Sequence, residues 1–216
     1  MKIYYIVTNS QFTLADNFFL PSVKKDNKAE ICPIYYDEMG KFGNGSFRTK
    51  QYLDTLIFRN KKILEIINTN LNDTVIVSDV DIYFFKPFVS ECEKLIKNLD
   101  ILHMRDGIEN LRPNGGFTVI NCNSKTLNFY EHILHQTINS ENKFYLDQDA
   151  MKDYYQNNFL NIKYDYLDQR FATMPDFSYW DKNFQKDCIC VHATCSGTVL
   201  DKTNKLNKLI STYNIH

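Results

Sequence analysis

The sequence lacks both an excess of one charge and a long hydrophobic run. Its 25 Lys and Arg residues balance 26 Asp and Glu residues, for a formal net charge of -1. That balance, without any basic block, argues against a nucleic-acid-binding surface. The apolar run at residues 3–7 is too short for a signal peptide, and no run approaches the about 20 residues of a membrane span. We therefore expect no membrane anchor in this chain, a cytoplasmic location, and a small-molecule or glycan partner.

The sequence also lacks an internal repeat, a low-complexity tract and a linker. Its 216 residues, 44% of them hydrophobic, can bury the core of one globular domain. The six cysteines are spaced irregularly, mostly inside apolar segments, which is typical of reduced core thiols rather than a disulfide framework. We therefore expect a single domain over residues 1–216.

Segments with the composition of strands alternate with segments of helical period, which is typical of an α/β fold. Strands are expected over residues 2–8, 30–36, 74–78, 100–105, 117–123, 161–167 and 188–194. Helices are expected over residues 12–24, 49–68, 89–99, 127–137, 147–156 and 200–210. The tetrapeptide PNGG at residues 113–116 is expected to form a turn before the strand that follows it.

Two aspartates interrupt an apolar stretch in VIVSDVDIYFF, residues 75–85. Ligands of open α/β sheets bind beyond the carboxyl ends of strands, where Asp79 and Asp81 are expected to lie. Isolated acids in a D-x-D pattern are often only turn residues. Here the chain becomes apolar again after them, so two buried charges cost free energy unless a cation compensates. The pair therefore predicts a site for a divalent cation.

Four segments together resemble the nucleotide-diphospho-sugar transferases of the GT-A fold. The segment VIVSDVDIYFFKPF resembles the strand and D-x-D motif of that family, and PNGGFTVINCN resembles its Gly-Phe strand. The segment YLDQDAM resembles the D-Q-D motif of its retaining branches, and VHATCSGTVLDK resembles its C-terminal His, Gly and Lys signature. The resemblance implies a Rossmann-like α/β/α sandwich around a mixed, mainly parallel sheet. It also implies transfer of a sugar from a nucleotide sugar, a UDP-sugar in our interpretation, to a glycan or glycoprotein acceptor.

The resemblance assigns expected roles to residues of the metal and donor sites. Asp79, Asp81 and His192 would bind Mn²⁺ or Mg²⁺, and an imidazole ligand favours Mn²⁺. Lys202 would meet the diphosphate near Gly197, although the spacing around Gly197 is looser than in the family. The remaining donor-binding candidates are Thr8 and Asn9 for the base, Lys61 ahead of the D-x-D strand, and Asn114, Gly115 and Gly116 for the sugar.

The D-Q-D segment supplies the expected catalytic residues, Asp147, Gln148 and Asp149. Acids at the start of a helix are often only capping residues. A glutamine between them is a poor nucleophile and no base, so the resemblance implies front-face substitution with retention of configuration. In that interpretation Gln148 and Asp147 position the sugar. An inverting enzyme needs a carboxylate base, for which Asp149 is the candidate.

Several alternatives stay open. Cys188, Cys190, Cys195 and His192 could form a zinc site, or His192 could be a core histidine. Lys61 could belong, with Arg48, Arg59 and Lys62, to a solvated helix face. Trp180 could be a platform for the acceptor. The whole chain could be a non-catalytic nucleotide-sugar or glycan-binding module, or a haloacid-dehalogenase-type phosphatase, although the latter expects Thr or Val where Tyr83 stands.

Overall fold

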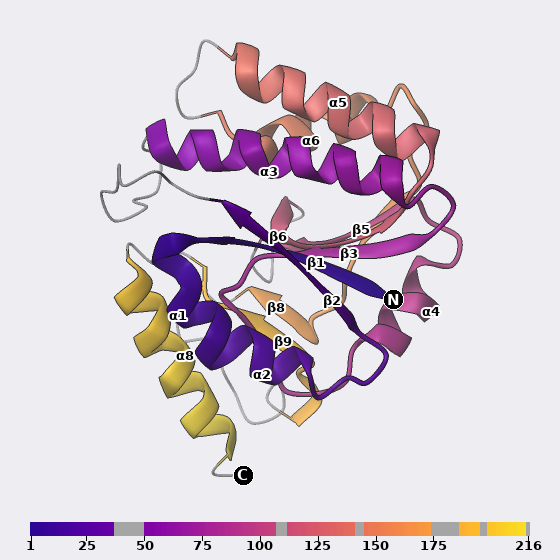
Figure 1. Cartoon of the computed structure of the whole chain (residues 1–216). Coiled ribbons are helices and arrows are strands. Elements are labelled where there is room, and N and C mark those ends of the chain that lie inside the picture. Colours follow the sequence, from indigo (N-terminus) through magenta and orange to yellow (C-terminus); the bar gives the residue numbers. More distant parts are fainter. Residues whose placement is uncertain (37–49, 107–111, 141–144, 174–185, 195–197, 215–216) are drawn as a thin grey trace.

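A computed structural model describes residues 1–36, 50–106, 112–140, 145–173, 186–194 and 198–214. Its main element is a six-stranded sheet with the order β2-β1-β3-β6-β5-β7 (Figure 1). The strands are β1 (Lys2–Thr8), β2 (Glu30–Tyr36), β3 (Thr74–Ser78), β5 (Ile101–Arg105), β6 (Pro113–Asn121) and β7 (Tyr164–Tyr166). Strand β6 pairs antiparallel with both of its neighbours, and the other pairings are parallel. The expected mixed, mainly parallel sheet is therefore confirmed.

Helices cover both faces of this sheet (Figure 1). Three of them pack on one face: α3 (Lys50–Thr69), α5 (Ser124–Asn139) and α6 (Asp147–Asn157). The other face carries α4 (Val89–Ile96), α8 (Val199–Asn214) and an N-terminal helical segment. That segment consists of η1 (Asn9–Gln11), α1 (Phe12–Leu14), η2 (Ala15–Phe19) and α2 (Leu20–Val23), so the helix expected over residues 12–24 is irregular.

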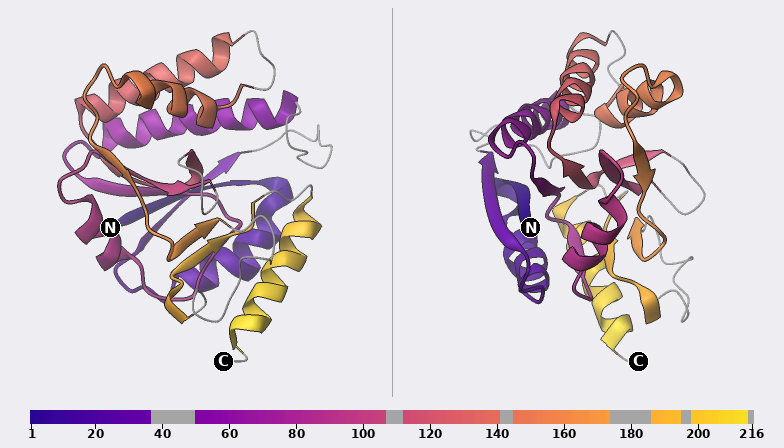
Figure 2. Two further views of the ribbon diagram at one scale, coloured as in Figure 1. Left: turned by 180° about the vertical axis from the view of Figure 1, so that it is seen from behind. Right: turned by 90° about the vertical axis from the view of Figure 1, so that its right-hand side faces the viewer.

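A second sheet of three short strands lies on the same side as α8 (Figure 2). Its order is β4-β9-β8, with β4 (Ile82–Phe84) antiparallel to β9 (Cys190–His192) and β9 parallel to β8 (Phe171–Thr173). Strands β4 and β8 were not predicted, because each has three residues and shows no alternating pattern. Strand β4 directly follows the D-x-D segment, so this segment connects the two sheets.

The core has two parts, one on each face of the main sheet. Val75 and Val77 of β3 point toward α3, α5 and α6, whereas Ile76 points toward the N-terminal helices and the small sheet. Burial of both faces explains why β3 is a continuous apolar run rather than an alternating one. None of the helices in the described ranges is both long and apolar enough to cross a membrane.

The PNGG segment is part of β6 and not a turn, so that prediction is wrong. Asn114 pairs with Met104, and the register shifts between His103 and Met104. Glycine inside a strand often marks a close approach of other groups to the backbone. Both glycines of this segment do so, as the site shows.

Candidate metal and donor site

Asp79 and Asp81 lie at the carboxyl end of β3, where the chain passes from the main sheet to the small one. Backbone hydrogen bonds fix both residues: the N–H of Asp79 donates to the carbonyl of Gly116 at 2.7 Å, and the carbonyl of Asp81 accepts from Ala193 at 2.9 Å. Ile82 of β4 pairs with His192 of β9. This register brings His192 next to the D-x-D segment although more than a hundred residues separate them in the sequence.

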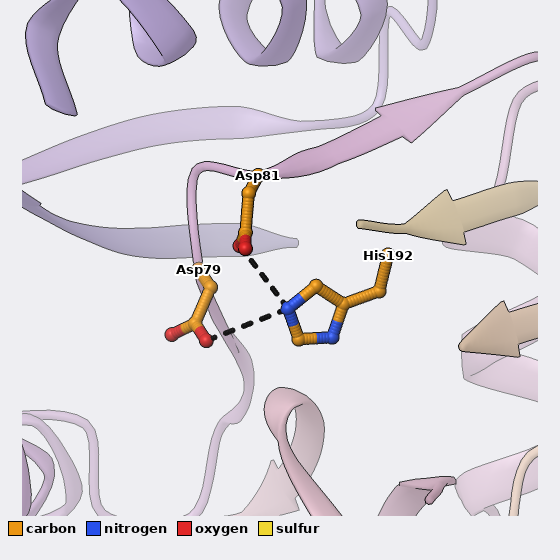
Figure 3. A group of neighbouring side chains, drawn as sticks. All are labelled: Asp79, Asp81 and His192. Carbon is orange, nitrogen blue, oxygen red and sulfur yellow. Dashed lines mark ion pairs between the residues drawn. The ribbon is translucent and has the colours of Figure 1, made fainter. Parts of the chain in front are cut away.

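The imidazole of His192 points at both carboxylates (Figure 3). Its Nε2 atom lies 3.1 Å from Oδ1 of Asp81 and 3.8 Å from Oδ2 of Asp79. One ligand atom from each of these side chains lies within 4.8 Å of the others. Asp81 and His192 are buried, and Asp79 is 38% exposed, which leaves an opening toward solvent. Two carboxylates and an imidazole form a suitable donor set for a divalent cation.

Asn114 fixes which nitrogen of His192 faces the carboxylates. Its Oδ1 atom accepts a hydrogen bond from the backbone N–H of Gly116 at 2.8 Å, so this oxygen is the acceptor side of the amide. The same oxygen lies 3.1 Å from Nδ1 of His192, which must therefore carry a proton. Nε2 therefore faces the two carboxylates, where it donates a hydrogen bond to Asp81 if the ring is protonated and offers a lone pair if the ring is neutral. With Nδ1 bound to Asn114, a neutral His192 would present its Nε2 lone pair to a cation held by Asp79 and Asp81, so the residues present fit a divalent cation.

Gly116 makes room for this ring. A Cβ atom at Gly116 would lie 2.1 Å from Cε1 and 2.6 Å from Nδ1 of His192. At Gly115, a Cβ atom would lie 2.8 Å from Nη1 of Arg59, whose Nη2 atom donates to the carbonyl of Gly115. The two glycines therefore admit one side chain on each side of β6, which explains the glycine pair inside a strand.

Lys202, in the first turn of α8, neutralises Asp81. Its Nζ atom lies 2.6 Å from Oδ2 of Asp81, the carboxylate oxygen that does not face His192. Burial by itself would raise the pKa of Asp81, but Lys202 and His192 outweigh it and lower this pKa. Burial by itself would lower the pKa of Lys202, but Asp81 outweighs burial and raises this pKa. Asp81 and Lys202 therefore form a charged pair at the edge of the metal cluster.

Arg59 joins the metal cluster to the start of α6. Its side chain is 7% exposed, with Nε 3.5 Å from Oδ1 of Asp79 and Nη1 3.4 Å from Oδ2 of Asp147. The Nδ2 atom of Asn60 also donates to Oδ2 of Asp147 at 3.2 Å. Burial raises the pKa of Asp147, and Arg59 and Asn60 oppose that shift only in part. Asp147 is therefore a buried carboxyl group that depends on Arg59 for its charge.

For Arg59, the alternative of a solvated helix face is wrong, because its side chain is buried. Leu56 and Ile63 of α3 are buried core residues, and Arg59 is three positions after the first and four before the second. The 3.6-residue period of a helix places all three on one face, so this signal was present in the sequence. Lys61, the predicted donor-binding residue, lies on the exposed face of the same helix.

The three predicted catalytic residues, at the start of α6, have different surroundings. The Oδ1 atom of Asp147 accepts from the backbone N–H of Gln148 at 2.8 Å, and the Gln148 side chain is half-buried. Asp149 caps the helix, because its Oδ2 atom accepts from the backbone N–H of Leu146 at 3.0 Å. Its Oδ1 atom accepts from Arg112 at 2.7 Å. The expected capping role of an acid in this segment is thus confirmed for Asp149.

The other predicted site residues are distributed along the carboxyl edge of the sheet or lie outside the described residues. Thr8 is buried at the end of β1, where its Oγ1 atom lies 3.0 Å from Oγ of Ser10, and Asn9 is exposed directly after it. Because β1 and β3 are parallel neighbours, Thr8 at the end of β1 and Asp79 directly after β3 lie at the same edge of the sheet. Gly197, Trp180, Arg48 and Cys195 lie outside the described residues.

The zinc alternative gains no support from the part of the chain that the structure describes. There, the group of side chains that could hold a metal consists of Asp79, Asp81 and His192. Cys188 and Cys190 are fully buried, and burial raises the pKa of both thiols, that of Cys188 to about 12. A zinc ligand must be a thiolate, which this environment disfavours.

Comparisons with solved structures find the same fold in several glycosyltransferases. A glycosyltransferase involved in the glycosylation of the major capsid of PBCV-1 superposes with a TM-score of 0.66 at 14% identity, over 96% of this chain and 98% of that one. Mouse xyloside xylosyltransferase 1 gives 0.57 at 12% identity, over 91% and 99%. An active-site mutant of LgtC gives 0.56 at 10% identity, over 98% and 96%. At these identities the likeness shows the fold, which is that of GT-A glycosyltransferases.

Comparison with the curated proteins finds none that matches this chain. A protein family does match it: the family described as nucleotide-diphospho-sugar transferase covers residues 14–209. This range includes the D-x-D segment, β6, the start of α6, His192 and Lys202. The chain therefore belongs to the nucleotide-diphospho-sugar transferase family.

Proposed function

We propose that this protein is a metal-dependent glycosyltransferase that moves a sugar from a UDP-sugar to a glycan or protein-linked glycan, with retention of configuration. The observation that carries the proposal is the cluster of Asp79, Asp81 and His192, in which Asn114 directs Nε2 of His192 at the carboxylates. The cluster lies at the carboxyl edge of the sheet, where α/β proteins bind their ligands. We propose a single catalytic domain over residues 1–216.

The metal ligands have a clear chemical purpose in such a reaction. A divalent cation held by them stabilises the negative charge that develops on the departing diphosphate. The imidazole among the ligands favours Mn²⁺ over Mg²⁺. Arg59 and Lys202 add positive charge on two sides of the cluster, at 3.5 Å from Asp79 and 2.6 Å from Asp81. The site therefore combines a cation position with positive side chains on two sides, which suits an anionic donor.

Two contacts at the start of α6 support retention. Gln148 offers a neutral amide, which is no base, and the neighbouring Asp147 carboxylate is buried and already accepts from Arg59 and Asn60. Asp149, the candidate base of an inverting mechanism, is occupied by Leu146 and Arg112. We propose that Gln148 and Asp147 position the sugar, with Asn114, Gly115 and Gly116 lining its site. Lys202 and Gly197 would contact the diphosphate, Thr8 and Asn9 the base, and Lys61 the donor from α3.

The proposal is tested with purified protein and a panel of nucleotide sugars carrying hexoses and pentoses, with Mn²⁺ and with or without EDTA. Release of the nucleotide and the thermal shift of the protein are measured in parallel. We expect release with at least one donor, loss of that release in EDTA, and loss of metal-dependent donor binding in Asp81→Ala. Absence of metal-dependent binding and release with every donor would contradict the proposal.

The same experiment separates the non-catalytic alternative. A nucleotide-sugar-binding module would be stabilised by a donor and Mn²⁺ but would transfer nothing, even with candidate glycan acceptors. The phosphatase alternative predicts phosphate release from simple phosphate esters, and neither the family nor the fold supports it.

A further inference from the structure

Lys202 holds one oxygen of Asp81, and His192 faces the other. Nζ of Lys202 lies 2.6 Å from Oδ2 of Asp81, and Nε2 of His192 lies 3.1 Å from Oδ1. The Asp81 side chain is 3% exposed and that of Lys202 is 23% exposed, so this ion pair is largely removed from water. The same carboxylate therefore pairs with an ammonium group through one oxygen and borders the proposed metal position with the other.

If Lys202 stays beside Asp81, its ammonium group and a bound divalent cation would repel each other. A cation bound between Asp79, Asp81 and His192 would lie on the other side of a single carboxylate from the ammonium group. Two positive charges so close in a partly buried site repel each other strongly. The ammonium group also neutralises the charge of Asp81, which reduces the attraction of the cluster for the divalent metal ion. Lys202 in this position therefore opposes metal binding.

Lys202 can leave Asp81, whereas Arg59 cannot easily leave its partners. The lysine has a flexible four-carbon stem and one described ion pair. It extends from the first turn of α8, which a reciprocal pair of hydrogen bonds between Thr198 and Asp201 fixes in place. Arg59 is held by Asp79, Asp147 and the carbonyl of Gly115. A movement confined to the Lys202 side chain would free Asp81 without unfolding the helix.

We propose that Lys202 is an exchangeable counter-ion of Asp81, which it releases when a nucleotide diphosphate arrives, so that the divalent cation and the nucleotide bind cooperatively. This inference rests on the proposed function, because it takes the donor diphosphate as the new partner of Lys202. In the free protein, the ammonium replaces the cation as the partner of Asp81. In the complex, Lys202 binds phosphate oxygens and Asp81 is available to the metal.

Cooperativity follows from this exchange by thermodynamic linkage. If the nucleotide removes Lys202 from Asp81, it raises the affinity for the cation, and the cation raises the affinity for the nucleotide by the same factor. Such couplings are commonly about 5-fold to 150-fold in affinity. The free protein should therefore bind Mn²⁺ weakly, and UDP should strengthen that binding.

The test is a titration of the full chain with Mn²⁺, with free Mn²⁺ measured by electron paramagnetic resonance, in the presence and absence of UDP. Lys202→Met removes the ammonium and keeps a similar stem. Lys208→Met, on the exposed face of α8, makes the same change in net charge away from Asp81. We expect Lys202→Met without UDP to bind Mn²⁺ about tenfold more tightly than the wild type or more, and to gain less from UDP than the wild type does, because no ammonium has to leave Asp81. Lys208→Met should behave like the wild type.

Loss of Lys202 leaves Asp81 buried without its ammonium, so the variant is expected to be less stable without metal. Lys202→Gln, which keeps a polar end, serves as the second variant. Thermal unfolding gives a second measurement, because Mn²⁺ alone should raise the melting temperature of either variant by more than that of the wild type.

The outcomes separate this inference from the proposed function. If the wild type binds Mn²⁺ and both Lys202 variants bind it equally or less tightly without UDP, Lys202 is a permanent structural partner and the inference is wrong. The metal site would then still stand. If no form binds Mn²⁺ with or without UDP, the metal site of the proposed function is wrong as well. Tighter Mn²⁺ binding by the Lys202 variants without UDP, in a protein that transfers sugar to no acceptor, would support the inference and contradict the transferase proposal.

Discussion

Nδ1 of His192 donates a hydrogen bond to Oδ1 of Asn114 at 3.1 Å, and this contact determines which ring nitrogen faces Asp79 and Asp81. The partner behind a metal-binding histidine commonly contributes about 10-fold to 100-fold in metal affinity. Here the partner is an amide whose own orientation is fixed by the N–H of Gly116.

Replacement of Asn114 should therefore weaken metal binding through His192. We expect Asn114→Ala to lower Mn²⁺ affinity by about 10-fold to 100-fold, because the imidazole loses the acceptor that sets its tautomer. Asn139→Ala, at an exposed position near the end of α5, is the control and should leave the affinity unchanged. The measurement is Mn²⁺ titration with UDP present. Equal affinities of the two variants would show that Asn114 does not orient His192.

Arg59 and Lys61 allow a matched comparison on one helix. Arg59→Met leaves the buried Asp147 without a cationic partner, and breaking a buried ion pair by removal of one member costs about 3–5 kcal/mol. Lys61→Met changes the charge by the same amount at an exposed position and should stay within about 0.5 kcal/mol of the wild type. Urea denaturation followed by circular dichroism measures both free energies of unfolding. Equal effects would mean that Asp147 does not depend on Arg59.

Gln148 and Asp149 distinguish a retaining from an inverting mechanism. Gln148→Ala should keep Mn²⁺ and UDP-sugar binding and lose transfer, because the amide is proposed to act only on the sugar. Asp149→Ala removes the hydrogen bond to the N–H of Leu146 and should cost about 1 kcal/mol of stability while transfer persists. Binding is measured by calorimetry and transfer by product formation. Normal transfer by Gln148→Ala, with transfer abolished in a folded Asp149→Ala, would favour an inverting enzyme.

His103 predicts a dependence of stability on pH. The ring is fully buried between Oγ1 of Thr118 at 3.2 Å and the hydroxyl of Tyr155 at 2.6 Å. Burial, with a smaller contribution from Arg59, lowers the pKa of His103 to about 3. A histidine in the unfolded chain has a pKa near 6.5. Between these values the unfolded state binds a proton that the folded state does not, so stability falls as the pH is lowered through this window.

The contribution of this one group can reach about 1.4 kcal/mol for each pH unit. We expect the free energy of unfolding of the wild type to fall more steeply from pH 6.5 to 4 than that of His103→Gln. His135→Gln, at an exposed position of α5, should keep the wild-type slope. Urea denaturation at several pH values gives the slopes. Parallel slopes for the wild type and His103→Gln would contradict the lowered pKa.

Much of the fold could be predicted from the sequence because its signals are local. The apolar run TVIVS predicts a strand, and it is continuous because both faces of the strand are buried. Helix α3 is predicted by the helical period of its apolar residues. The error at PNGG has a different origin. Its glycines leave space for Arg59 and His192, which approach β6 from distant parts of the chain. The strands β4 and β8 were missed because three residues carry too little pattern.

By itself, the sequence determined the alternation of strands and helices and the position of two acids at the end of a buried strand. These features depend on residues close together in the chain, where hydrophobic period and turn chemistry act. The tertiary structure decided which groups meet those acids. The pairing of β4 with β9 places His192, the phase of α3 buries Arg59 while Lys61 stays exposed, and the first turn of α8 delivers Lys202 to Asp81. Such contacts are set by strand register and helix packing over long separations, which a single sequence does not encode locally.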